Sequence, residues 1–138
     1  MIYLLDLNYT LVENSLDKVS PFSRQIESEC YRAALVDALK NERVFLLTAR
    51  PHKYREATLA SIIQKTHWAP ERTYFNEHNL PPPQAKEIML KNLREEFPDE
   101  EFYGIESNPK TRTMYATHGV KSEPWERWLN GHPARLDV

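Results

Sequence analysis

The fold is decided by the stretch IYLLD at residues 2–6. Four consecutive apolar residues are typical of a short strand buried on both faces, as in a parallel sheet covered by helices. The stretch VFLLT at residues 44–48 has the same pattern, with a threonine where the first stretch has an aspartate. The two stretches therefore predict two buried strands that each end at a polar residue.

Outward from these strands, apolar residues alternate between helical spacing and short continuous runs. The other predicted elements are, in chain order, a helix over 21–40, a helix around 57–63, a strand at 72–75, a stiff proline connector at 81–83, a helix over 84–97, a strand at 102–105, a helix over 110–117, a strand from 120 and a helical turn over 125–129. This alternation predicts an α/β fold, a three-layer doubly wound (Rossmann-like) parallel sheet of about five strands. We expect one core domain over 1–130 and a C-terminal tail over 131–138.

The composition of the chain excludes several kinds of site. The 138 residues include only three glycines, Gly104, Gly119 and Gly131, so neither a glycine-rich dinucleotide motif nor a P-loop is present. The net charge of −2 argues against bulk electrostatic attraction to nucleic acid. The five histidines do not share the spacing of metal ligands, so no zinc site is expected.

The chain has a single cysteine, Cys30, which cannot form an internal disulfide and so fits a reducing compartment. It falls within the predicted helix over 21–40, where we expect a small buried residue rather than a nucleophile. No apolar stretch approaches the roughly 20 residues needed to span a membrane. We therefore expect a cytoplasmic protein with no membrane partner.

Polar side chains gather where the predicted strands end. In a doubly wound sheet, the ligand site lies outside the carboxyl ends of the strands. The polar residues that follow strands or open the third long helix are Asp6, Asn8, Thr10, Thr48, Arg50, Lys86, Glu106, Ser107 and Asn108. Carboxylates with a hydroxyl and a lysine can bind a divalent cation and a phosphoryl group, and Mg²⁺ prefers such oxygen ligands. The sequence therefore predicts a phosphate site with Mg²⁺ at this edge of the sheet.

Four of these stretches together resemble the motifs of a known family. Residues 6–12, DLNYTLV, are similar to a first motif DxDxT[LV], and residues 46–51, LLTARP, are similar to a second motif. Lys86 stands in the place of a third-motif lysine, and residues 103–111, YGIESNPKT, are similar to a fourth, acidic motif. In this order the motifs resemble those of the haloacid dehalogenase (HAD) superfamily, over residues 2–120. The TARP form of the second motif resembles the nucleotide and polynucleotide phosphatase branches of that superfamily.

The resemblance implies a catalytic carboxylate and a metal site. Asp6 would be the nucleophile that forms an aspartyl-phosphate. Asn8 would occupy the catalytic position of the family's general acid and base. A carboxylate oxygen of Asp6, the backbone carbonyl of Asn8 and the side chain of Glu106 would hold Mg²⁺.

The resemblance also implies a phosphate site on the second strand. The side chain of Thr48, the amide of Ala49 and Lys86 would hold the transferring phosphoryl oxygens, whose charge needs preorganised donors. Arg50 would contact the substrate outside the phosphate, where a guanidinium suits a second phosphate or a base. Structural interpretations stay open, with Thr48 as a helix N-cap and Arg50 and Lys86 as ordinary surface charges.

Two residues depart from the family's pattern. The family's phosphatases have aspartate at the position of Asn8, and an amide can form hydrogen bonds but cannot exchange a proton near neutral pH. The loss of a general acid or base typically costs roughly 10²–10⁴ in rate. The family's fourth motif often carries two acidic residues, whereas Glu106 is followed by Ser107 in this chain. The predicted metal site therefore has one acidic ligand fewer. His52, close to the second motif, is an alternative proton donor.

These observations predict a Mg²⁺-dependent phosphomonoester hydrolase without a cap domain, because the motif spacing leaves no room for one. An open site suits a phosphorylated small molecule such as a nucleotide, a phosphorylated nucleic acid end, or a cover supplied by a second copy of the chain in a homo-oligomer. The alternative is a HAD-like domain that binds a phosphorylated ligand or partner in a regulatory role with little turnover, since Asn8 replaces the acid and base. A third hypothesis is a reaction at Asp6 that does not involve phosphate.

Overall fold

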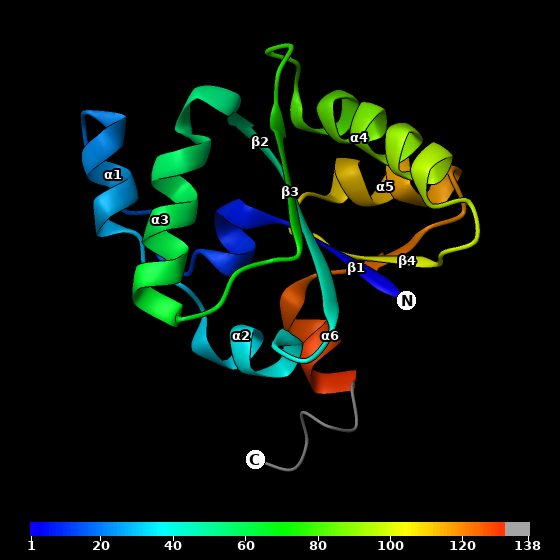
Figure 1. Cartoon of the computed structure of the whole chain (residues 1–138), viewed down its shortest axis with the longest axis horizontal. Coiled ribbons are helices and arrows are strands. Elements are labelled where there is room, and N and C mark those ends of the chain that lie inside the picture. The colour runs from blue at the N-terminus through cyan, green and yellow to red at the C-terminus, as the bar shows by residue number, and fades with distance from the viewer. Residues whose placement is uncertain (132–138) are drawn as a thin grey trace.

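The computed structural model describes residues 1–131 as a five-stranded sheet with helices on both faces (Figure 1). The strands are β1 (Ile2–Leu5), β2 (Arg43–Pro51), β3 (Arg72–Asn76), β4 (Phe102–Ile105) and β5 (Lys121–Glu123). Their spatial order is β3-β2-β1-β4-β5, and every neighbouring pair runs parallel. The predicted three-layer doubly wound α/β fold is therefore confirmed.

Helices on the two faces of the sheet enclose two hydrophobic cores. The helices are α1 (Phe22–Ser28), α2 (Ala33–Leu39), α3 (Arg55–Thr66), α4 (Pro82–Glu96), α5 (Pro109–Thr117) and α6 (Trp125–Gly131). One core contains Leu5 of β1 and residues of α2, α3 and α6, whereas the other contains Leu4 of β1 and residues of α4 and α5. Figure 1 shows α4 and α5 together on one side of the sheet. Alternate residues of each buried strand thus serve opposite cores.

The predicted single helix over 21–40 is wrong, because the chain forms α1 and α2 with an extended segment between them. This segment pairs with the loop that follows β1. The backbone N–H of Glu13 donates to the carbonyl of Cys30 over 2.9 Å, and that of Arg32 donates to the carbonyl of Leu11 over 2.8 Å. Since these hydrogen bonds replace intrahelical ones, Cys30 is exposed rather than buried in a helix.

Two predicted boundaries also change. The prediction that residues 81–83 all lie in a connector is wrong, because Pro82 and Pro83 form the first turn of α4. Proline fits there because the first N–H groups of a helix have no intrahelical acceptor. Helix α6 extends to Gly131, the first residue of the predicted tail, and the rest of that tail, 132–138, lies outside the described residues.

The strand order places a topological switch point beside β1. Strand β1 pairs with β2 on one side and β4 on the other, so that Leu5 lies opposite both Leu46 and Ile105. Asp6 and Glu106 follow Leu5 and Ile105, and therefore leave the sheet at the same level. This is the place where open α/β sheets bind their ligands.

Candidate active site

Three charged side chains from distant parts of the chain meet at the carboxyl edge of the sheet. Asp6 follows β1, Glu106 follows β4, and Lys86 lies near the start of α4. The Nζ atom of Lys86 lies 2.8 Å from Oδ1 of Asp6 and 2.5 Å from Oε1 of Glu106. Asp6 is 8% exposed, and Lys86 and Glu106 are each 2% exposed. The structure thus brings these three predicted residues together, and the interpretation of Lys86 as an ordinary surface charge is wrong.

Both carboxylate oxygens of Asp6 are held by donors. Oδ1 accepts a hydrogen bond from Lys86, and Oδ2 accepts from the hydroxyl groups of Thr10 and Ser107, each over 2.8 Å. Burial raises the pKa of Asp6, but the charge of Lys86 and the hydrogen bonds from Lys86 and Ser107 outweigh it, so the pKa lies below its ordinary value. Asp6 is therefore an oriented, ionised carboxylate, which is the form that a nucleophile needs.

Lys86 places one positive charge between two carboxylates. Burial lowers the pKa of Lys86, but the charges of Asp6 and Glu106 outweigh it and raise the pKa above its ordinary value. For Glu106 the balance is different, because burial and the charge of Asp6 together raise its pKa to about 7. Of the two carboxylates, Asp6 is therefore the one that is fully ionised at neutral pH.

The loop after β4 is held in place by its own hydrogen bonds. The backbone N–H of Asn108 donates to Oε2 of Glu106 over 3.1 Å, and Oδ1 of Asn108 accepts from the N–H of Lys110 at the start of α5. Nη1 of Arg112 donates to the carbonyl oxygens of Glu106 and Ser107, each over 2.9 Å. Glu106 and Ser107 are therefore oriented before any ligand binds.

Asp6, Asn8 and Glu106 offer oxygen atoms that suit a magnesium ion. The hydroxyl oxygen of Ser107 lies 2.8 Å from Oδ2 of Asp6 and 3.4 Å from the backbone carbonyl oxygen of Asn8, so these two oxygens lie beside the same group. Two carboxylates and a carbonyl, completed by water and substrate oxygens, form a donor set that Mg²⁺ accepts. Within residues 1–131, no cluster of three or more His, Cys, Asp or Glu side chains could hold a metal ion. A cation at this site would therefore depend on the Asn8 carbonyl.

Thr48 and Ala49 lie on β2, next to β1. Strand β2 is longer than predicted and continues to Pro51, so the interpretation of Thr48 as a helix N-cap is wrong. Oγ1 of Thr48 accepts from the backbone N–H of Arg50 over 3.1 Å, and across residues 1–131 the Thr48 hydroxyl hydrogen has no acceptor. The predicted contacts of Thr48 and of the Ala49 amide with phosphate stay predictions.

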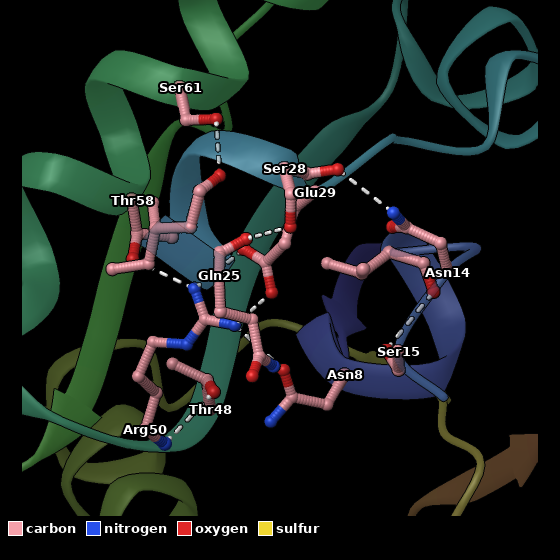
Figure 2. Close-up of polar contacts among 12 residues, drawn as sticks. Asn8, Asn14, Ser15, Gln25, Ser28, Glu29, Thr48, Arg50, Thr58 and Ser61 are labelled. Atoms are coloured by element: carbon pink, nitrogen blue, oxygen red, sulfur yellow. Dashed lines mark hydrogen bonds and ion pairs between the residues drawn. The ribbon is translucent and has the colours of Figure 1, made fainter. Parts of the chain in front are cut away.

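The guanidinium of Arg50 lies in an internal polar cluster (Figure 2). Its Nη1 and Nη2 atoms donate to Oε1 and Oε2 of Glu29 over 2.9 and 2.5 Å, which makes a two-point ion pair. Nη1 also donates to Oγ1 of Thr58 over 3.0 Å, and Nη2 donates to Oδ1 of Asn8 over 2.9 Å. With Arg50 only 3% exposed, the interpretation of this residue as a solvated surface charge is wrong, and its contact with substrate stays a prediction.

Glu29 supplies the negative charge of this cluster, and neither Glu29 nor Thr58 is among the residues predicted from the sequence. Glu29 follows α1 directly and is 2% exposed. A buried arginine needs a carboxylate partner, so the only available signal was the position of Arg50 beside a buried strand. Nothing in the sequence pattern distinguishes Glu29 from its exposed neighbour Glu27.

His52, the alternative proton donor, lies in an exposed turn. This turn, His52–Tyr54, connects β2 to α3. Nδ1 of His52 lies 3.8 Å from Oε1 of Glu77, and both side chains are more than half exposed. Its part in proton transfer stays a prediction.

The resemblance to the HAD superfamily rests on the four motifs and on their arrangement in the structure. No protein-family model matches the chain, and no curated protein matches it. None of the helices within residues 1–131 is long and apolar enough to cross a membrane.

Proposed function

We propose that this chain is a HAD-like hydrolase that removes phosphate from phosphomonoesters through an aspartyl-phosphate on Asp6, with Mg²⁺ as its cofactor. The observation that supports the proposal is the meeting of Asp6, Lys86 and Glu106 at the carboxyl edge of the sheet. Each of the three residues belongs to a different one of the four motifs. The strand order alone brings Asp6 and Glu106 to one edge of the sheet, but a chance match of short motifs would give no reason for Lys86 of α4 to lie between their carboxylates.

The proposal assigns a role to each residue of the site. Asp6, ionised and held by hydrogen bonds, would attack the phosphorus atom. Lys86, the hydroxyl of Thr48 and the amide of Ala49 would stabilise negative charge on the phosphoryl oxygens. When bound by Asp6, Glu106 and the carbonyl of Asn8, Mg²⁺ would supply further positive charge to the phosphoryl group.

The proposed substrates are nucleotides or phosphorylated nucleic acid ends. The form of the second motif supports this class, and within residues 1–131 the segments between the motifs form core helices rather than a separate cap domain. An uncovered site suits a phosphate at the end of a larger substrate. A cytoplasmic location is part of the same proposal and is supported by the single Cys30, which has no cysteine partner.

The experiment that tests the proposal is Mg²⁺-dependent release of phosphate from an aryl phosphate. We expect the wild-type protein to release phosphate and Asp6→Asn to release none. The matched control is Asp99→Asn, which makes the same chemical change at an exposed turn and should leave the rate unchanged. Absence of release by the wild type, or full activity of Asp6→Asn, would overturn the proposal.

Asn8 favours a second candidate function, in which the domain binds a phosphorylated ligand or partner in a regulatory role. An amide at this position cannot act as an acid or base, which slows turnover but leaves the binding groups in place. Calorimetry with inorganic phosphate and Mg²⁺ separates the two functions. Binding of phosphate by a wild-type protein that turns over no phosphorylated probe would support the regulatory function.

A further inference from the structure

A chain of hydrogen bonds runs from Glu29 through Arg50 to Asn8 (Figure 2). Both carboxylate oxygens of Glu29 accept from Arg50, and Nη2 of Arg50 donates to Oδ1 of Asn8 over 2.9 Å. A guanidinium has only donors, so the oxygen of the Asn8 amide must face Arg50. The NH₂ group of Asn8 must therefore point away from Arg50.

Arg50 is held firmly enough to fix this orientation. Its guanidinium also donates to Thr58, and its central carbon lies 5.0 Å from the centre of the Phe22 ring. Arg50 and Glu29 are 3% and 2% exposed, so water does not compete for their two-point ion pair. A rotation of the Asn8 amide would place its NH₂ group against this buried cation.

The NH₂ group of Asn8 is free to bind a ligand, and the backbone of the same residue lies beside the Asp6 site. Asn8 is partly exposed, and in the part of the chain that the structure describes its NH₂ group has no acceptor. The backbone carbonyl of the same residue lies 3.4 Å from the Ser107 hydroxyl, which donates to Asp6. Position 8 therefore borders the nucleophile and presents a donor that cannot release a proton.

We propose that this arrangement selects substrates whose phosphoryl group has an acidic leaving group, namely phosphoric anhydrides and acyl phosphates, over alkyl phosphomonoesters. The inference rests on the aspartyl-phosphate step of the proposed function. Among the proposed substrates it favours nucleotides that carry a phosphoric anhydride over phosphorylated nucleic acid ends, which are alkyl phosphomonoesters. An alcohol leaves as an unstable alkoxide unless an acid protonates it, and the Asn8 amide supplies no proton. A phosphate or carboxylate leaving group is stable as an anion, and a hydrogen bond from the Asn8 NH₂ group stabilises its developing charge.

The reaction balances without an acid from the protein. A carboxylate oxygen of Asp6 forms a bond to phosphorus, and the bond from phosphorus to the leaving oxygen breaks with its electron pair on that oxygen. The leaving group departs as an anion. Water then attacks the phosphorus of the aspartyl-phosphate, the bond to Asp6 breaks, and the proton of the water passes to the phosphate product or to solvent.

The test compares three probes with Mg²⁺: acetyl phosphate, nitrophenyl phosphate and glycerol phosphate. We expect kcat/KM of the wild type to be at least about 10² lower for glycerol phosphate than for the other two, the size of a missing general acid. Asn8→Asp restores a side chain that can exchange a proton at the same partly exposed place. In this variant, the ratio of kcat/KM for acetyl phosphate to kcat/KM for glycerol phosphate should fall by about tenfold or more. If this ratio is the same in Asn8→Asp as in the wild type, the inference is overturned.

Glu29 is tested as a positioning residue in the same assay. Glu29→Gln weakens the hold on Arg50, and we expect kcat for acetyl phosphate to fall several-fold while KM changes little. The matched control is Glu27→Gln, an exposed position on α1, which should leave both constants unchanged. If Glu29→Gln does not fold, the Asn8→Asp comparison decides the inference. An unchanged kcat in a folded Glu29→Gln would show that Glu29 does not position Asn8 for the reaction.

Failure of this inference is distinguishable from failure of the proposed function. Mass spectrometry of the wild type after incubation with acetyl phosphate should find one phosphoryl group on Asp6. Turnover of glycerol phosphate as fast as acetyl phosphate, with Asp6 phosphorylated, would overturn the leaving-group selection alone. Absence of both turnover and phosphorylation for every probe would overturn the inference and the proposed function together.

Discussion

Replacing Lys86 with methionine removes the only cation paired with the carboxylates of Asp6 and Glu106 among the described residues. The variant keeps the approximate side-chain length but leaves two buried carboxylates without a charge partner. Breaking a buried ion pair by removing one member costs about 3–5 kcal/mol. Because Lys86 is 2% exposed, water does not replace the lost contact. A domain of this size has about 5–15 kcal/mol of stability, so a large share should be lost. The melting temperature should fall by roughly 10 °C or more.

The size of this loss should depend on pH. Lys86 helps to lower the pKa of Asp6 in the folded protein, so this contribution to stability is present above the unfolded pKa of about 4. It is lost as the pH falls through the lowered folded value. Urea unfolding followed by circular dichroism at neutral pH and at a pH below the lowered folded pKa of Asp6 measures the difference. The variant should approach the wild type in acid.

Lys91→Met is the matched control, because Lys91 lies on the exposed face of the same helix. It should change the free energy of unfolding by no more than about 0.5 kcal/mol. A loss below about 1 kcal/mol for Lys86→Met would contradict a buried ion pair at Lys86, since buried pairs cost more than that when broken. A loss of equal size at both pH values would contradict the electrostatic explanation.

Three further predictions concern stability. Burial raises the pKa of Glu106 to about 7, so the stability that its protonated form contributes is complete below about pH 4.5 and is lost as the pH rises through 7. Relative to the wild type, Glu106→Gln should therefore gain roughly 2–3 kcal/mol in the free energy of unfolding as the pH rises over this range in metal-free buffer. The same pH dependence of the free energy of unfolding in both proteins would contradict this prediction. Gly104→Ala places a Cβ 2.9 Å from the Cβ of Ser122 on β5 and 3.0 Å from the Tyr115 ring on α5, which should cost about 1–3 kcal/mol in urea unfolding. A neutral result would contradict this close packing. Glu29→Ala leaves Arg50 buried without a charge partner and should cost about 3–5 kcal/mol. Replacing both residues with apolar ones should cost less than Glu29→Ala alone, and an additive loss would contradict the pairing.

The strands were predictable because the burial of a strand on both faces determines its sequence pattern. Runs such as residues 2–5 and 44–47 are apolar at every position, and such runs occupy the buried strands of a parallel sheet. The strand order then brings Asp6 and Glu106 to one edge, and α4 brings Lys86 to them. This part of the candidate site follows from local pattern plus the rules of α/β topology.

The division between α1 and α2 was not predictable, because its cause lies elsewhere in the chain. The helical spacing over 21–40 continues through Cys30 and gives no sign of a break. The carbonyl of Cys30 accepts from Glu13, a contact between segments that no local pattern encodes. The break between α1 and α2 also turns Glu29 towards Arg50. The orientation of the Asn8 amide depends on this contact, so it could not be predicted from the sequence either.

The central claim is that Asp6 accepts a phosphoryl group. Its most direct test is mass spectrometry of the protein after incubation with acetyl phosphate and Mg²⁺, with fragmentation to locate the modified residue. We expect an increase in mass equal to one phosphoryl group on Asp6, its removal by hydroxylamine, which cleaves acyl phosphates, and no modification of Asp6→Asn. An unmodified wild-type protein, or a phosphoryl group carried by another residue and retained in Asp6→Asn, would contradict it.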